Sequence, residues 1–234
     1  MGDSVKVNIL TVGKLPIPIE STFGSTGEWI RKVIPTEWES HIINYSGKPF
    51  LTEEISDSWI IAGSFSSVTD TSEWMQTLID ETRELIRSNI PILGVYFGHQ
   101  LLATSMGGKV IPNPIGMEIG YSEIHLTEAG RKSYLYEDNL DGFFVCQSHV
   151  DTVIEPPRGS VILAKNQYGI QSIQYDEHVF GVQYHPEFSS GLMCSLFDYY
   201  RIDNTAQDGH KILPDLTVSE QVLFNFLNAL KKEK

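Results

Sequence analysis

The segment ILGVYFGHQLL, residues 92–102, holds one side chain where a nucleophile could act. Gly94 and Gly98 flank Tyr96 at two residues on either side, which is the spacing of a nucleophile elbow between a strand and a helix. Crowding at such a bend leaves room only for hydrogen at the flanking positions and strains the backbone of the central residue. An elbow presents a nucleophile for covalent catalysis. Loop glycines beside a core tyrosine are the competing interpretation.

The segment GVQYHPEFS, residues 181–189, contains a candidate base and a candidate orienting acid. If residues 179–185 form a strand, alternation puts Gln183, His185 and Glu187 on one side, and Pro186 kinks the chain so that imidazole and carboxylate can meet. A carboxylate that fixes the tautomer of a histidine facing a nucleophile is the general logic of a catalytic triad. A solvated surface pair is the simpler interpretation of the same two residues.

Two more segments carry polar groups suited to a reacting carbonyl. IIAGSFSSVTD, residues 60–70, ends a strand in a glycine turn, where the N–H of Ser64 and that of Phe97 would form an oxyanion hole. CQSHVDTV, residues 146–153, contains His149 and Asp151. These two side chains either line a polar pocket or only form hydrogen bonds within the turn.

The surrounding pattern predicts the elements that hold these residues. Strands are expected at 5–12, 40–45, 58–63 and 92–96, with helices at 27–34 and 73–90 between them. This rhythm indicates a mostly parallel sheet covered by helices on both faces. From residue 108 short strands and turns predict appended antiparallel ribbons, followed by closing helices at 187–200 and 217–234. No linker divides the chain, so residues 1–234 are expected to form one domain.

Composition excludes several classes of protein. Seventeen Lys and Arg against thirty Asp and Glu give a formal net charge of -13, which disfavours nucleic acid and anionic membranes as partners. Two cysteines without CxxC spacing suggest neither a disulfide framework nor a zinc site. No run of about 18 apolar residues and no signal peptide are present, so a cytoplasmic, soluble protein is expected.

The order and spacing of these segments resemble the class I glutamine amidotransferases, especially stand-alone proteins similar to the amidotransferase domain of GMP synthase. The matching segments are IIAGSFSSVTD, PILGVYFGHQLLATSMGGKV, GMEIGYSEIHLTEAG, SHVDTV and GVQYHPEFS. The resemblance implies an α/β, flavodoxin-like three-layer sandwich with a mostly parallel central sheet and an appended antiparallel ribbon. It also implies hydrolysis of the glutamine side-chain amide to glutamate and ammonia through a cysteine thioester.

Carried over by position, the resemblance makes His185 the general base and Glu187 its orienting acid, with Ser64 and Phe97 as oxyanion-hole donors. Glutamine or a related small amino-acid ligand would be held by Gly63, Gln100, Ser148, His149, Val150 and Asp151. The resemblance implies no cofactor and no metal. Any synthetase that accepts ammonia would be a separate subunit. Phe65 stands where the family usually has proline, and Val150 replaces a common glycine.

Tyr96 occupies the position of the family's cysteine nucleophile. A phenol has a pKa near 10 against about 8.5 for a thiol, so its deprotonation costs about 2 kcal/mol more, and the ring extends into the space of the substrate amide. We therefore expect ordinary glutaminase activity to be absent or very weak. Three interpretations remain: a pseudoenzyme that binds an amino-acid-like ligand, an active hydrolase or γ-glutamyl-transfer enzyme that uses Tyr96 or water activated by His185, and a non-catalytic regulatory subunit.

Two further sets of residues are of types that could carry chemistry. Cys146, three residues before His149, is either a substitute thiol or a small buried hydrophobe, and the second is the more common role. A metal site formed by His99, His149 and His185 is the other possibility, but these histidines lack the close sequence spacing that ligands of a zinc site show.

Overall fold

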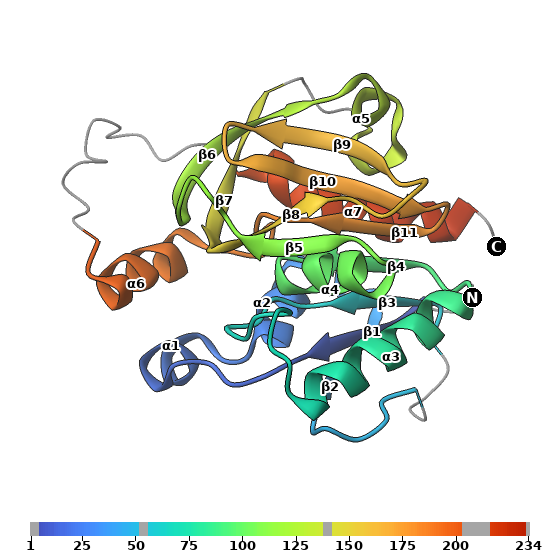
Figure 1. Ribbon diagram of the computed structural model, residues 1–234, viewed down its shortest axis with the longest axis horizontal. Helices are drawn as coiled ribbons and strands as arrows, with labels where there is room; N and C mark the ends of the chain where they lie inside the picture. Colours follow the sequence, from blue (N-terminus) through green and yellow to red (C-terminus); the bar gives the residue numbers. More distant parts are fainter. Residues whose placement is uncertain (1–4, 52–55, 138–141, 203–215, 233–234) are drawn as a thin grey trace.

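The computed structural model of the protein covers residues 1–234 and describes residues 5–51, 56–137, 142–202 and 216–232 (Figure 1). In the described residues, nine strands form one mixed sheet in the order β2-β1-β3-β4-β11-β10-β9-β6-β7. The first five are mutually parallel: β2 (Glu39–Asn44), β1 (Lys6–Thr11), β3 (Ser58–Ile61), β4 (Ile92–Val95) and β11 (Val179–Val182).

The other four strands of this sheet run antiparallel to their neighbours: β10 (Gly169–Asp176), β9 (Val161–Asn166), β6 (Glu118–Leu126) and β7 (Phe143–His149). Strands β5 (Lys109–Pro112) and β8 (Asp151–Glu155) form a separate antiparallel pair. The predicted α/β class is therefore confirmed, with one difference of detail. Strand β11 was expected in an antiparallel ribbon, and it does pair antiparallel with β10, but on its other side it pairs parallel with β4 as the fifth parallel strand.

Helices cover both faces of the sheet, as the sequence pattern predicts (Figure 1). One face carries α2 (Thr26–Val33) and α7 (Thr217–Lys232), and the other carries α3 (Glu73–Arg87), α4 (Phe97–Ser105) and the β5–β8 pair. Three further helices are short: α1 (Ile17–Phe23), α5 (Glu128–Lys132) and the 3-10 helix η1 (Tyr134–Tyr136). Helix α6 (Ser190–Tyr200) lies beside α1 at one end of the molecule.

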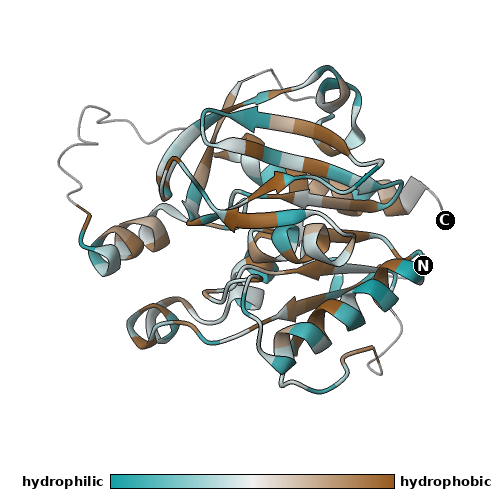
Figure 2. Ribbon diagram, viewed as in Figure 1, coloured by the Kyte–Doolittle hydropathy of each residue, from teal (hydrophilic) through white to brown (hydrophobic). Residues whose placement is uncertain are grey.

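The core forms because successive strand residues point to opposite faces. In β1, Ile9 packs with α2 and α7, whereas the next residue, Leu10, packs with α3 and α4. Figure 2 shows the apolar residues gathered on the central strands and the hydrophilic ones along the outer side of α3. A third apolar cluster lies under α1 and α6 and includes Cys146, Phe188 and Leu192. Among the described residues, no helix has the length and apolar character needed to cross a membrane.

Candidate active site

Tyr96 forms a strained corner between β4 and α4. Its φ of 52° and ψ of -101° place a non-glycine residue at positive φ, where L-residues are strained, which costs about 1–3 kcal/mol when the fold enforces it. A Cβ on Gly98 would lie 2.1 Å from the Ile61 carbonyl oxygen, and one on Gly94 would lie 2.5 Å from the Gly98 carbonyl carbon. The two glycines are therefore required by crowding at the corner, as the elbow hypothesis predicts.

Three parallel strands deliver their carboxyl ends to this corner. Gly94 of β4 is paired with Ile61 of β3 on one side and with Gly181 of β11 on the other. Residues that follow these strands are thus brought together, and the loop after β3 and the turn after β11 both reach Tyr96. A Cβ built on Gly63 would lie 3.2 Å from Cε1 of His185 and 3.3 Å from Cδ1 of Tyr96. The carboxyl edge of a parallel sheet is the usual position for a ligand site.

His185 and Glu187 meet in the interior, as their spacing predicts. Nδ1 of His185 lies 2.8 Å from Oε1 of Glu187, and both side chains are buried. When the carboxylate is ionised, Nδ1 carries the hydrogen and Nε2 presents its lone pair. No described residue pairs with Nε2. The imidazole also stacks on Phe188, with ring centroids 3.7 Å apart, which fixes its orientation.

The phenol of Tyr96 lies next to this base without bonding to it. The ring centroids of Tyr96 and His185 are 4.9 Å apart with an interplanar angle of 48°. Within the described part of the chain, the Tyr96 hydroxyl makes no hydrogen bond. Burial raises the pKa of the Tyr96 phenol far above its ordinary value, and the neighbouring Tyr200 and Asp151 raise it further. The hydroxyl therefore stays protonated.

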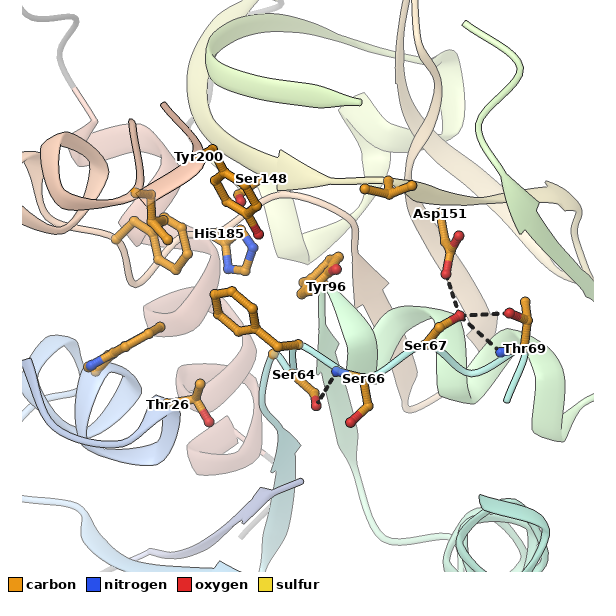
Figure 3. A pocket seen from close by; sticks show the side chains of 16 residues that line it. Thr26, Ser64, Ser66, Ser67, Thr69, Tyr96, Ser148, Asp151, His185 and Tyr200 are labelled. Carbon is orange, nitrogen blue, oxygen red and sulfur yellow. Dashed lines mark hydrogen bonds between the residues drawn. The ribbon is translucent and has the colours of Figure 1, made fainter. Parts of the chain in front are cut away.

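A cavity of about 330 Å³ opens in front of Tyr96 and His185, within the range of small-molecule sites (Figure 3). Of the residues predicted to form the site, five besides this pair line the cavity: Gly63, Ser64, Ser148, Val150 and Asp151. Phe97 lies beneath with a buried side chain. Because Phe97 begins α4, its N–H lacks an acceptor within the helix and remains a candidate oxyanion donor, together with the N–H of Ser64.

The wall formed by Asp151 is tied to the loop after β3. Oγ of Ser67 donates to Oδ2 of Asp151 at 2.5 Å, and Thr69 N–H donates to Oγ of Ser67 at 3.1 Å. Ser66 N–H donates to Oγ of Ser64 at 3.0 Å. These contacts order a hydroxyl-rich turn opposite His185. The sequence contained a signal for it, since IIAGSFSSVTD has four hydroxyl residues, but their partners lie far along the chain.

Gln100 and His149 lie behind the wall rather than in the cavity. Both hold the backbone carbonyl of Asp151: Nε2 of Gln100 donates to it at 2.9 Å, and Nδ1 of His149 is 3.0 Å away. Nε2 of His149 is 2.8 Å from Oε2 of the buried Glu118. A carbonyl can only accept, so Nδ1 carries a hydrogen. The His149–Glu118 contact then needs a second shared proton, on the imidazole as a cation or on the carboxyl group.

Cys146 does not line the cavity. The buried thiol packs in the third apolar cluster, and its backbone carbonyl accepts a hydrogen bond from the N–H of His185 at 2.9 Å. Burial raises the pKa of the Cys146 thiol well above its ordinary value, and the charges of Glu187 and Glu220 raise it further. These observations favour the interpretation of Cys146 as a small buried hydrophobe. Among the described residues, no group of histidine, cysteine and carboxylate side chains is arranged to hold a metal ion.

Sequence reasoning missed the apolar side of the cavity. Its members come from elements far apart in the chain, and amphipathic patterning alone assigns them to the core: Trp29 of α2, Phe188, and Leu196 and Tyr200 of α6. Only the fold, which gathers Trp29, Phe188 and Leu196 in one apolar cluster, shows that they share a wall. Glu118 was missed for the same reason, because its partners on β7 and β10 are remote in sequence.

Comparisons with known proteins identify the family of the chain. The family model described as glutamine amidotransferase class-I matches residues 26–197. The chain is 27% identical over 185 residues to γ-glutamyl peptidase 5 of Arabidopsis thaliana, covering 76% of this chain and 69% of that protein. It is 33% identical over 159 residues to the glutamine-hydrolyzing GMP synthase of Bacteroides fragilis, covering 67% of this chain and 30% of that protein.

The fold is also that of a solved glutamine amidotransferase from Thermotoga maritima, with a TM-score of 0.69 and 19% identity over 99% of this chain and 98% of that one. Relatives of two kinds, a peptidase and a synthase, are thus similar to this chain in sequence. Since the family model covers most of the chain, the protein belongs to the class I glutamine amidotransferase family.

Proposed function

We propose that residues 1–234 form one amidotransferase-type domain that binds a γ-glutamyl compound or a related amino-acid ligand without cysteine thioester chemistry. The observation that carries this proposal is the elbow itself. It holds Tyr96 where the family reaction needs a thiol, and the Tyr96 hydroxyl does not contact Nε2 of His185. Ser64 and Phe97 would polarise the ligand carbonyl, while Gly63, Ser148 and Asp151 would contact its amino-acid end.

Nucleophilic attack by the phenol is disfavoured for physical reasons. Proton transfer to His185 requires a hydrogen bond between the two groups, which this arrangement lacks. Burial further raises the pKa of the Tyr96 phenol, so a phenolate is rare. The product of attack would be an aryl ester formed from an unactivated amide, which is uphill. The ring also occupies space directly in front of the base.

Hydrolysis by activated water is the second candidate, and the unpaired Nε2 of His185 favours it. The imidazole would take a proton from water, the hydroxide oxygen would attack the amide carbon, and the C–N bond would break as His185 returns the proton to the leaving nitrogen. Ligand binding and water-mediated hydrolysis would both use the same cavity. The name of the γ-glutamyl peptidase relatives is consistent with a γ-glutamyl ligand in either case. A regulatory subunit docked on a separate synthetase, as suggested by the GMP synthase relatives, is the third.

Release of glutamate and ammonia from glutamine tests these alternatives. We expect no turnover by the unchanged chain or by Tyr96→Ala, which opens the site without supplying a thiol, and a clear gain for Tyr96→Cys. Because general base catalysis contributes about 10²–10⁴-fold, adding His185→Ala to Tyr96→Cys should remove the gain. Turnover by the unchanged chain that persists in Tyr96→Phe and is abolished by His185→Ala would instead establish the water mechanism. Failure of Tyr96→Cys to bind or cleave any γ-glutamyl compound would contradict a preserved site.

A further inference from the structure

The cavity has two chemically different sides, with Tyr96 between them. On one side, Figure 3 shows Ser67, Thr69 and Asp151 directed toward one another, joined by the hydrogen bonds described above. On the other side lie His185 and Tyr200. Of the residues that line the cavity in the described part of the chain, Asp151 is the one carboxylate, and none is lysine or arginine. The Asp151 side therefore suits an ammonium group.

The His185 side is apolar and aromatic. Phe188 stacks on the imidazole and meets Trp29 edge-on, with ring centroids 5.7 Å apart. Leu196 belongs to the same apolar cluster, and Tyr200 continues the wall along α6. These side chains provide a surface that water solvates poorly and that an apolar ligand group would cover.

The chemistry of amide cleavage assigns the two sides to the two ends of a substrate. A histidine that activates the attack returns its proton to the leaving nitrogen, so the group on that nitrogen lies on the histidine's side of the scissile bond. Here that side is the apolar one. The α-amino-acid end then lies on the opposite side, where Asp151 can accept from its ammonium group. Free ammonia, the leaving group from glutamine, has no apolar surface to place against Phe188, Trp29 and Leu196.

The apolar side also continues to the molecular surface. Phe65 is 39% exposed and packs edge-on against Tyr199, which is 46% exposed, with ring centroids 6.2 Å apart. Tyr199 in turn contacts Tyr200 at 5.1 Å. Phe65 is the residue that replaces the proline usual at this position. An aromatic rim of this kind gives a substituent room to extend beyond the cavity.

We propose that the preferred ligand is a γ-glutamyl amide whose nitrogen carries an aromatic or large apolar substituent, rather than glutamine. This inference rests on the proposed function and names its ligand class. The γ-glutamyl group lies toward Asp151, the amide carbonyl faces Ser64 and Phe97, and the substituent covers Phe188 and reaches Phe65.

Titration calorimetry on the full unchanged chain tests the proposal with four probes: γ-glutamylphenylalanine, γ-glutamylglycine, glutamine and phenylalanine. We expect γ-glutamylphenylalanine to bind about tenfold or more tightly than glutamine or γ-glutamylglycine, as burial of an aromatic group predicts. Phe65→Ala should reduce that preference several-fold and leave glutamine binding unchanged, whereas Phe65→Leu should keep part of it. Ile17→Ala removes a side chain that is 80% exposed and outside the cavity, so it should change nothing.

The outcomes separate this inference from the proposed function. Equal affinity for glutamine and γ-glutamylphenylalanine would overturn the substituent assignment and leave γ-glutamyl binding standing. Binding of phenylalanine as tight as that of γ-glutamylphenylalanine would also overturn it, because the γ-glutamyl group would then contribute nothing. If none of the γ-glutamyl probes binds the unchanged chain, both proposals fail.

Discussion

The rings of Tyr96 and His185 are neighbours at 4.9 Å, yet Nε2 of His185 has no hydrogen-bond partner among the described residues. The hydroxyl of Tyr96 therefore contributes little that a phenyl ring would not. We predict that Tyr96→Phe changes the free energy of unfolding by less than about 0.5 kcal/mol and leaves ligand affinity unchanged, measured by denaturant titration and calorimetry. If the unchanged chain does turn over and Tyr96→Phe does not, the phenol would be identified as a nucleophile.

Crowding at the corner predicts a large effect for the smallest possible substitution. Gly98→Ala would place a methyl group 2.1 Å from the Ile61 carbonyl oxygen, and the backbone must shift to relieve it. We expect a loss of about 1–3 kcal/mol of unfolding free energy in urea titration. Gly191→Ala is the matched control, since its Cβ would find no atom nearer than 3.7 Å and the site is helical. A control less stable than Gly98→Ala would contradict the packing argument.

Oxygens of the buried Glu118 side chain lie 2.8 Å from Nε2 of His149 and accept from the amide groups of Gln171 and Asn166 at 3.1 and 2.6 Å. Glu118→Gln keeps the shape but sets an amide N–H₂ against these donors. We predict a loss of about 2–4 kcal/mol in unfolding free energy. Glu123→Gln, on the exposed side of the same strand, should be near neutral. Equal stability of the two variants would show that the buried contacts are not needed.

The buried imidazole of His99 predicts a pH dependence of stability. Burial, and then the nearby His149, lower the pKa of His99 to about 3 in the folded state. The unfolded chain takes up this proton below about 6.5, so folded stability is lost as pH falls from about 6.5 toward 3. Between pH 6.5 and 5 this amounts to at most about 2 kcal/mol.

His99→Asn tests the assignment, because its amide can still donate to the Tyr175 hydroxyl as Nδ1 does at 2.8 Å. The variant should be less stable than the unchanged chain at neutral pH, but its free energy of unfolding should fall less on acidification. Urea titration at about pH 6.5 and about pH 5 measures both effects. His125→Asn alters an exposed histidine and should keep the original slope. An unchanged slope in His99→Asn would show that another group titrates.

The two cysteines are predicted to differ in reactivity. Cys194 is exposed, whereas Cys146 is buried with its pKa raised by that burial. A chromogenic disulfide reagent should therefore modify Cys194 in the folded protein and both thiols in denaturant. Cys194→Ser should abolish the reaction of the folded form. Rapid modification of Cys146 in that variant would revive its candidacy as a substitute nucleophile.

Local spacing was enough to predict the strained corner at Tyr96, because each part of it is determined within a few residues. The glycines around Tyr96 follow from crowding, and the Glu187 carboxylate reaches His185 across one proline. The alternation of strands and helices likewise predicted the sheet class. What could not be predicted was the full strand pairing: nothing in residues 179–182 shows that the strand pairs parallel with β4 in addition to its antiparallel pairing with β10.

Placement of the remaining site residues depends on contacts between distant segments. Gln100 and His149 were expected to touch ligand, but both are directed to the Asp151 carbonyl. The apolar wall joins α2, Phe188 and α6, which are more than 150 residues apart in sequence at their extremes, from Trp29 to Tyr200. The residue types alone did not predict this wall, because an aromatic residue is equally suited to a hydrophobic core and to the wall of a binding site.

The packing of the corner has a consequence for recognising enzymes from sequence. Gly94 and Gly98 are demanded by the approach of α4 to β3 and β4, whichever side chain residue 96 carries. Selection for folding alone would therefore preserve this signature long after turnover had ceased. A search that scores the glycines and the histidine would count such a chain among working catalysts, and only the identity of the residue between the glycines separates the two.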